Sequence, residues 1–325
     1  MEEMKHAWEK EKNPLVILTG PTAVGKTKLS IELAKALDGE IISADSMQVY
    51  RYMDVGTAKI TKDEMDGVTH YLIDEIDPRE EFNVVKFQTL AKQYMEDIYR
   101  KGKVPIIVGG TGFYIQSVLY DINFAENEED TTYRMELEEL AKQKGANYLH
   151  EMLKDIDPIS YESIHENNIK RVIRALEYYK QTGTPISAHN EEQRKNESPY
   201  AFTYFVLNNE REVLYKNIDK RVDIMVDNGL LDEVKHLKDL GYTRDLVSMQ
   251  GLGYKEILAY LDGECTLEEA IYILKRDTRH FAKRQLTWFK REKDVTWVNK
   301  QEFDQKEEEI LSFMLKVCKE RNSCK

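Results

Sequence analysis

One short segment of the sequence has residue types suited to binding phosphate groups. Residues 20–27 match the pattern G-x-x-x-x-G-K-[ST]. In this pattern, glycines let backbone N–H groups turn toward phosphate oxygens, the lysine adds a mobile positive charge, and the final hydroxyl can bind Mg²⁺. An apolar run precedes the segment and a helical pattern follows it, so a helix dipole also favours the anion. We predict a diphosphate cradle formed by Gly20, Pro21, Thr22, Ala23, Val24, Gly25, Lys26 and Thr27.

A single carboxylate, Asp45, follows a second apolar run at residues 41–42. Ligands of open α/β sheets bind beyond the carboxyl ends of the strands, so this side chain should lie near the phosphate loop. There it could serve as a general base, or bind Mg²⁺ through water. It could equally form an Asx turn with Ser46, and the residues alone leave both interpretations open.

Glycines also follow the apolar run at residues 104–108, in the string Gly109-Gly110-Thr111-Gly112. A nucleotide hydrolase would be expected to place an Asp here to hold Mg²⁺. Glycines would instead allow the close approach of a ligand, which argues against a simple ATPase. A plain turn between a strand and a helix is the alternative interpretation.

One predicted helix is unusually basic for a chain whose net charge is −12. Residues 275–293 hold eight Lys or Arg and only two acids. A solvated amphipathic helix would explain its apolar side, whereas binding of a phosphate backbone would also explain why its polar side lacks Glu. At helical spacing, four cations share one face of this helix: Arg276, Arg279, Lys283 and Lys290. A weaker basic stretch lies earlier in the chain, at Lys170, Arg171, Arg174 and Lys180.

The elements that must position these residues alternate along the chain. Apolar runs at residues 15–18, 41–42, 70–73 and 104–108 alternate with helical spacing, which predicts right-handed βαβ units and a parallel sheet. The fold class is therefore α/β, a P-loop NTPase-like parallel sheet flanked by helices. Residues 123–198 show helical spacing and no convincing strand. We predict an inserted all-helical domain there, within a core of residues 1–122 and 199–325 that ends in C-terminal helices.

Composition excludes several classes of protein. The chain has 325 residues, of which 41% are hydrophobic and 33% charged, unlike a disordered or a membrane protein. No apolar run reaches the roughly 18 residues of a membrane helix, and residues 1–14 are too charged for a signal peptide. Cys265, Cys318 and Cys324 contain no CxxC pair and indicate neither a disulfide framework nor a zinc site. We expect a cytoplasmic protein without membrane association.

Together these strings resemble the tRNA dimethylallyltransferase family, also called tRNA isopentenyl-adenosine synthases. The resemblance runs from about residue 15 to residue 298. Thr69 and Ile60 depart from the usual pattern, and the missing C-terminal zinc finger favours the bacterial type. Eight strings in this order are specific: GPTAVGKT at 20–27, DSMQVY at 45–50, MDVGTAK at 53–59, HYLID at 70–74, GGTGFY at 109–114, RALE at 174–177, MQGLGY at 249–254 and AKRQLTWF at 282–289.

The resemblance implies transfer of a dimethylallyl group from its diphosphate to the exocyclic amine of an adenosine. In the family this adenosine lies immediately 3′ of the anticodon, in tRNAs that read codons starting with U. The partners implied are tRNA, dimethylallyl diphosphate and Mg²⁺, with Thr27 as the hydroxyl ligand of the metal. The pattern at residues 20–27 is also typical of nucleotide binding and ATP binding. We expect the chain to act as a monomer.

The resemblance also assigns roles to matching positions. Asp45 becomes the base, Thr22 lies beside the leaving oxygen, and Arg221 adds a cation on the diphosphate. An extruded base would be held by Ser46, Gln48 and Thr111, since an anticodon-loop base must leave its stack. The remaining predicted tRNA contacts are Met47, Arg134, Lys170, Arg171, Arg174, Gln250, Gly251, Gly253, Tyr254, Arg279, Lys283 and Arg284.

Three alternatives remain. A P-loop small-molecule kinase would consume ATP and need no RNA. A non-catalytic RNA-binding protein would keep only a relict phosphate loop. Isopentenyl transfer to free AMP would use the same diphosphate site, but a free nucleotide needs no extended cationic surface.

Overall fold

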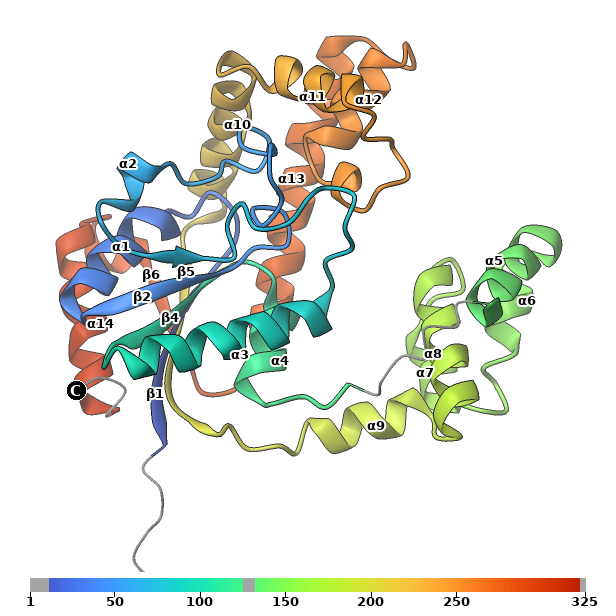
Figure 1. Ribbon diagram of the computed structural model, residues 1–325, viewed down its shortest axis with the longest axis horizontal. Coiled ribbons are helices and arrows are strands. Elements are labelled where there is room, and N and C mark those ends of the chain that lie inside the picture. The colour runs from blue at the N-terminus through green and yellow to red at the C-terminus, as the bar shows by residue number, and fades with distance from the viewer. Residues whose placement is uncertain (1–11, 125–131, 322–325) are drawn as a thin grey trace, which may run out of the picture. The chain divides into compact units, whose positions relative to one another are not determined.

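The computed structural model describes residues 12–124 and 132–321, so Cys324 and most of residues 1–14 lie outside the described part. The chain divides into two compact units (Figure 1). The first joins Met1–Leu119 to Ser198–Lys325, and the second is Tyr120–Glu197. The second unit overlaps the insertion expected over residues 123–198. Among the described residues, Cys265 and Cys318 form no disulfide bond.

A six-stranded sheet forms the centre of the first unit, in the order β3-β2-β4-β1-β5-β6. All neighbouring strands are parallel, which confirms the predicted fold class. The apolar runs are strands because both faces of a parallel sheet are covered by helices. In β1, the side chains from Leu15 to Leu18 are fully buried. The strands are β1 (Asn13–Thr19), β2 (Gly39–Ala44), β3 (His70–Tyr71), β4 (Val104–Gly109), β5 (Tyr200–Asn208) and β6 (Val295–Asn299).

The third strand is shorter than the sequence indicated. A strand over residues 70–73 was expected, but β3 ends at Tyr71. Leu72 and Asp74 have φ values of 61° and 57°, in the left-handed region that strands do not use. The prediction was wrong for the last two residues because an apolar run cannot report such a turn.

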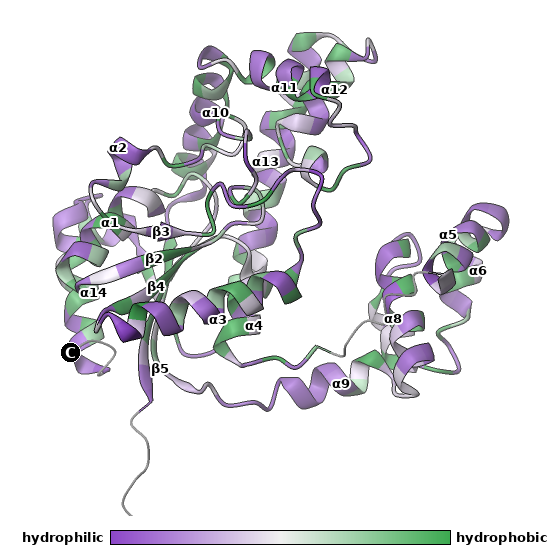
Figure 2. Cartoon of the chain, viewed as in Figure 1, coloured by the Kyte–Doolittle hydropathy of each residue, from purple (hydrophilic) through white to green (hydrophobic). Residues whose placement is uncertain are grey.

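Helices cover both faces of this sheet. On one face, α1 (Lys26–Ala36), α10 (Arg211–Asp227) and α14 (Glu307–Glu320) bury apolar residues such as Leu33, Ile218 and Met314 against β1, β4 and β5. On the other, α3 (Val84–Arg100) and α4 (Gly112–Leu119) pack together and against the strands. Along α3, hydrophobic residues recur among hydrophilic ones, as expected of a half-buried helix (Figure 2). The remaining helical segments are α2 (Lys62–Met65), α11 (Leu230–Asp239), α12 (Tyr254–Leu261), and the 3₁₀ turns Ser248–Gln250 and Lys300–Phe303.

The basic helix is α13 (Leu267–Phe289), and it begins at a capping box between Thr266 and Glu269. The helix was expected to continue to residue 293, which is wrong because it ends at Phe289. The N–H of Arg291 bonds to the carbonyl of Trp288 in a closing turn, and Asp294 takes a φ of 55° before β6. Lys290 is the C-cap residue of the helix, and its N–H still bonds to the carbonyl of Leu286.

The described residues of the second unit form helices joined by turns, with no strand. Its core is one apolar cluster that includes Leu137, Leu149, Leu153 and Val172. Asp157, almost wholly buried, accepts hydrogen bonds from the backbone and hydroxyls of Ser160 and Ser187. The helices are α5 (Thr132–Lys144), α6 (Ala146–Glu151), α7 (Pro158–Ser163), α8 (Ile169–Thr182) and α9 (Ile186–Gln193).

Among residues 12–124 and 132–321, no helix is both long and apolar enough to cross a membrane.

Candidate active site

The phosphate loop lies between β1 and the N-terminus of α1. Gly20 and Gly25 have φ values of 148° and 95°, which glycine adopts without strain. A Cβ at Gly20 would also lie 2.3 Å from the carbonyl oxygen of Leu207 in β5. Lys26 Nζ donates hydrogen bonds to the carbonyls of Gly20 and Pro21, at 2.9 and 2.8 Å. The loop is thus held in a ring around its own ammonium group.

The electrostatic environment of Lys26 favours the binding of an anion. Burial, together with the neighbouring Arg221 guanidinium, lowers its pKa from 10.5 to about 7, against a smaller opposing effect of Asp45. The charged ammonium is therefore costly in this environment, and a bound anion would offset that cost. Lys26 and Arg221 are brought together from residues nearly two hundred positions apart in the sequence.

A cleft of about 390 Å³ opens in front of the loop, within the size range of small-ligand sites. It belongs wholly to the first unit. Ile41, Ile60, Ile73 and Val108 give part of its wall an apolar surface. The sequence-predicted residues that line it are Thr22, Ala23, Gly25, Lys26, Thr27, Asp45, Gln48 and Arg221.

One face of α10 supplies the cationic wall opposite the loop. Asn217, Lys220, Arg221 and Ile224 all line the cleft, and their spacing places them on the same side of the helix. Burial lowers the pKa of Arg221, while Asp45 acts in the opposite direction. Its guanidinium donates to the carbonyl of Thr57 at 3.3 Å. Sequence reasoning missed Asn217 and Lys220, although their i and i+3 spacing to each other was a signal that could have found them.

The structure shows an Asx turn at Asp45 and also places this residue in the lining of the cleft. Oδ1 accepts the N–H of Met47 at 2.9 Å and that of Gln48 at 3.3 Å, which forms an Asx turn. The same carboxyl group lines the cleft, within electrostatic reach of Lys26 and Arg221. The turn therefore orients the carboxylate rather than competing with a role in the site.

The glycine string at residues 109–112 is required by the protein's own packing. A Cβ at Gly109 would lie 2.3 Å from the carbonyl oxygen of Ala44, and one at Gly110 would lie 2.1 Å from Nε2 of Gln285. A Cβ at Gly112 would lie 2.2 Å from the indole of Trp288. Close approach was expected from a ligand, but it comes from β2 and α13. Gly109 and Gly110 still line the cleft.

Gln285 of α13 joins the two glycine-containing loops. Its Oε1 accepts the N–H of Thr22 at 2.9 Å, and its Nε2 donates to the carbonyl of Gly110 at 3.0 Å. The side chain also lines the cleft although the residue is 6% exposed. Gln285 lies within the family string at residues 282–289, but the sequence predicted no role for it. A polar residue on the apolar face of a helix was the available signal.

Several predicted contacts lie away from the cleft lining. Val24 is buried, and Gly20, Pro21, Ser46 and Thr111 are absent from the lining. Met47 lies against Gly251, where a Cβ would come within 2.5 Å of the Met47 methyl group. Those residues shape the loops rather than the wall of the cleft.

Tyr254 is a correction to the predicted RNA contacts. Its side chain is fully buried, and its hydroxyl donates to Glu233 at 2.7 Å. Direct contact between this side chain and RNA is therefore excluded in this conformation. Gly253, with a φ of 95°, donates its N–H to Glu256, and the exposed Gln250 donates to the carbonyl of Arg244.

The predicted cations differ in how freely they could meet a phosphate. On α13, Lys283 and Arg284 are exposed, whereas Arg279 is paired with Asp219. On α5 of the second unit, Arg134 forms a bidentate pair with Glu177, at 2.8 and 3.0 Å. A bidentate pair holds a guanidinium firmly, which counts against Arg134 as an RNA contact. On α8, Lys170 and Arg171 are exposed, and Arg174 lies 6.0 Å from the ring of Tyr178.

A family model described as IPP transferase matches residues 48–292, which is most of the chain. The chain belongs to the IPP transferase family. A tRNA dimethylallyltransferase from Lachnoclostridium phytofermentans is 69% identical over 312 residues, covering 96% of this chain and 99% of the relative. Family membership confirms the resemblance drawn from the eight sequence strings.

Solved structures of IPP transferases share the fold. The crystal structure of the full-length tRNA isopentenylpyrophosphate transferase from Bacillus halodurans is 50% identical, with a TM-score of 0.72 and coverage of 96% of this chain and 98% of that one. A eukaryotic dimethylallyltransferase acting on tRNA is 31% identical, with a TM-score of 0.76, and covers 88% of this chain and 74% of its own.

Proposed function

We propose that the chain transfers a dimethylallyl group from dimethylallyl diphosphate to the exocyclic amine of an adenosine in tRNA, releasing diphosphate. The adenosine would lie 3′ of the anticodon in tRNAs that read codons starting with U. Family membership supports the reaction class, because relatives carry the name tRNA dimethylallyltransferase. The observation that carries the proposal is that Lys26, Arg221 and Asp45 line one cleft.

The cationic wall suits a departing diphosphate. Negative charge develops on the bridging oxygen as the allylic C–O bond breaks, so fixed positive charge there stabilises the transition state. Lys26, Lys220 and Arg221 face this space from two elements. Thr22, whose N–H is held by Gln285, would place its hydroxyl beside the leaving oxygen. The apolar wall of isoleucines and Val108 suits the dimethylallyl chain.

A magnesium ion would fit this arrangement through Thr27. Among the described residues no group of three or more His, Cys, Asp or Glu could hold a metal. Mg²⁺ often uses few protein ligands and completes its shell with substrate phosphates and water, and the Thr27 hydroxyl lines the cleft. When bound, the metal would neutralise charge on the diphosphate.

Asp45 is the proposed base. The lone pair of the adenine amine is delocalised into the ring, so the amine is a poor nucleophile. Its proton becomes acidic as the N–C bond forms, and a carboxylate can then accept it. One oxygen of Asp45 is occupied by the turn to Met47 and Gln48, which fixes the direction of the other.

The acceptor base and its RNA would be held by the surrounding residues. Gln48 lines the cleft, and Ser46 and Thr111 lie on the loops that follow β2 and β4. Lys283 and Arg284 of α13, and Lys170 and Arg171 of α8, would bind phosphates of the anticodon stem-loop. We also propose that the chain acts as a monomer in the cytoplasm.

The deciding experiment supplies radiolabelled dimethylallyl diphosphate and unmodified tRNA without ATP. We expect label in tRNA and, by nucleoside mass spectrometry, an isopentenyl adenosine 3′ of the anticodon. Strict dependence on ATP with a phosphorylated product would instead identify a small-molecule kinase. Label in free AMP but not in tRNA would identify an AMP prenyltransferase. Binding of tRNA without any transfer would leave only an RNA-binding protein.

A further inference from the structure

Residues 53–59 form a loop beside the cleft that the assignments above leave without a role. The backbone of this loop reaches two groups of the proposed site. Gln48 Nε2 donates to the carbonyls of Thr57 and Ala58, both at 3.3 Å, and Arg221 donates to the carbonyl of Thr57 at 3.3 Å. The position of these two carbonyls therefore sets where the Gln48 amide and the Arg221 guanidinium lie.

A single carboxylate holds the first half of the loop. Glu233, on α11, accepts the N–H groups of Asp54, Val55 and Gly56 at 2.9, 2.7 and 3.0 Å. Its Oε1 also accepts the Tyr254 hydroxyl at 2.7 Å. Three convergent backbone N–H groups make a concave anion site, and here a side chain of the same chain fills it. Gly56 is required, because a Cβ there would lie 2.6 Å from the Tyr254 ring.

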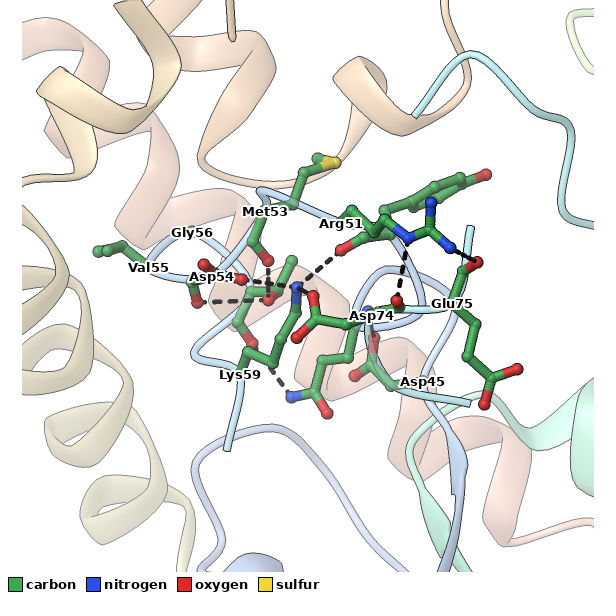
Figure 3. A network of polar contacts seen from close by, with 12 residues as sticks. Asp45, Arg51, Met53, Asp54, Val55, Gly56, Lys59, Asp74 and Glu75 are labelled. Atoms are coloured by element: carbon green, nitrogen blue, oxygen red, sulfur yellow. Dashed lines mark hydrogen bonds and ion pairs between the residues drawn. The ribbon is translucent and has the colours of Figure 1, made fainter. Parts of the chain in front are cut away.

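A single ammonium group holds the second half. Lys59 Nζ pairs with Asp54 at 2.6 Å and with Asp74 at 2.5 Å, and it donates to the carbonyl of Tyr50 at 2.6 Å (Figure 3). The Lys59 side chain is 4% exposed, while the two carboxylates are more than half exposed. A buried ammonium requires such partners, because a charge buried without them is strongly destabilising.

We propose that Glu233 and Lys59 are positioning residues for the transfer, acting through the Thr57 and Ala58 carbonyls on Gln48 and Arg221. This inference rests on the proposed function, because it assigns the two side chains to that site. Neither residue lines the cleft, so neither is a catalytic residue. Tyr254, fully buried at the start of α12, helps to hold the same loop through its hydrogen bond to Glu233. This role accounts for its place among the family strings.

The test compares two variants that keep side-chain size. Glu233→Gln puts an amide N–H where backbone N–H groups already point, and Lys59→Met removes the ammonium while keeping the chain length. We expect each to lower kcat/KM for transfer to tRNA by about 10- to 100-fold, as small displacements of catalytic groups do. Lys238→Met is the matched control, since it removes an ion pair with Asp262 from the same helix α11 without touching the loop. It should stay within about twofold of the unaltered chain.

Double variants separate positioning from general destabilisation. Rates are measured well below each thermal midpoint and corrected for the folded fraction. If Glu233 acts through Gln48, then adding Glu233→Gln to Gln48→Ala should cost less than about threefold, far below its cost alone. The same cycle with Lys238→Met should show no coupling.

Two results would overturn the proposal. One is a Glu233→Gln or Lys59→Met protein whose kcat and both KM values match those of the unaltered chain. The other is a loss that stays equally large in both the Gln48→Ala and the Arg221→Ala background, which marks a merely structural effect. Should a variant be too unstable to assay, Asp74→Asn replaces it, because this change removes only the ion pair of Lys59 with a half-exposed carboxylate. The same two results would then overturn the proposal. Failure of the unaltered chain to label tRNA would instead reject the proposed function.

Discussion

At the scale of single residues, Asp45 combines two tasks that substitution can separate. Asparagine keeps the side-chain oxygen that accepts the N–H groups of Met47 and Gln48, but it cannot take up a proton. Asp45→Asn should therefore retain the turn and lower kcat by about 100- to 10,000-fold, with tRNA affinity nearly unchanged. Single-turnover rates and filter binding measure the two quantities. A defect confined to tRNA affinity would show that the carboxylate is no base.

Lys26 gives a second prediction at this scale, through its pKa of about 7. Between that value and 10.5 the folded chain binds fewer protons at this group than the unfolded chain, so this group makes the free energy of unfolding rise with pH there. In NMR titrations of the lysine side chain, Arg221→Ala should raise the pKa of Lys26, because it removes a neighbouring cation. Asp45→Asn should lower it, and added pyrophosphate should raise it. A midpoint near 10.5 in the unaltered chain would contradict this electrostatic picture.

The residue scale also shows where sequence reasoning stops. Residues 20–27 and Asp45 could be found from the sequence, because their chemistry is local and their strands are apolar runs. The partners of Gln285 and Glu233 could not be predicted, since they lie far away along the chain. Tyr254 was misassigned to RNA because a family string does not distinguish a side chain that binds substrate from one that holds a loop.

At the scale of elements, α13 serves two functions on two faces. Gln285 and Trp288 pack against the glycines that follow β4, while Lys283 and Arg284 are exposed. The sequence indicated this basic surface, but it included Arg279, which the structure pairs with Asp219. That pair joins α13 to α10, and periodicity within one helix cannot report a partner on another.

Two exposed cations of α13, Lys283 and Arg284, can be tested by substitution. Lys283→Ala with Arg284→Ala should weaken tRNA binding and flatten its salt dependence, by about 0.7 in the logarithmic slope for each lost contact with a single strand. Pyrophosphate affinity should stay unchanged, because neither side chain lines the cleft. Lys316→Ala with Lys319→Ala on α14 is a control of equal charge. An unchanged slope would make this face of α13 an ordinary solvated surface.

At the scale of the whole molecule, the two units divide the proposed work. All residues of the cleft belong to the first unit, and the exposed pair Lys170 and Arg171 belongs to the second. Lys170→Glu with Arg171→Glu should raise the KM for tRNA several-fold, of the order expected for two lost phosphate contacts, and leave pyrophosphate affinity unchanged. Equal KM values for tRNA would remove α8 from the RNA contacts.

The strand order carries a consequence for how the chain is made. β1 lies between β4 and β5, and the helical unit separates those two neighbours in the sequence. During synthesis from the N-terminus, β1 and β4 therefore emerge long before β5, and one edge of β1 waits uncovered. The helical unit has its own core and can fold in that interval. Gln285 of α13 links the phosphate loop to the loop after β4 by hydrogen bonds. A nascent chain stalled before α13 would therefore have a phosphate loop without this link.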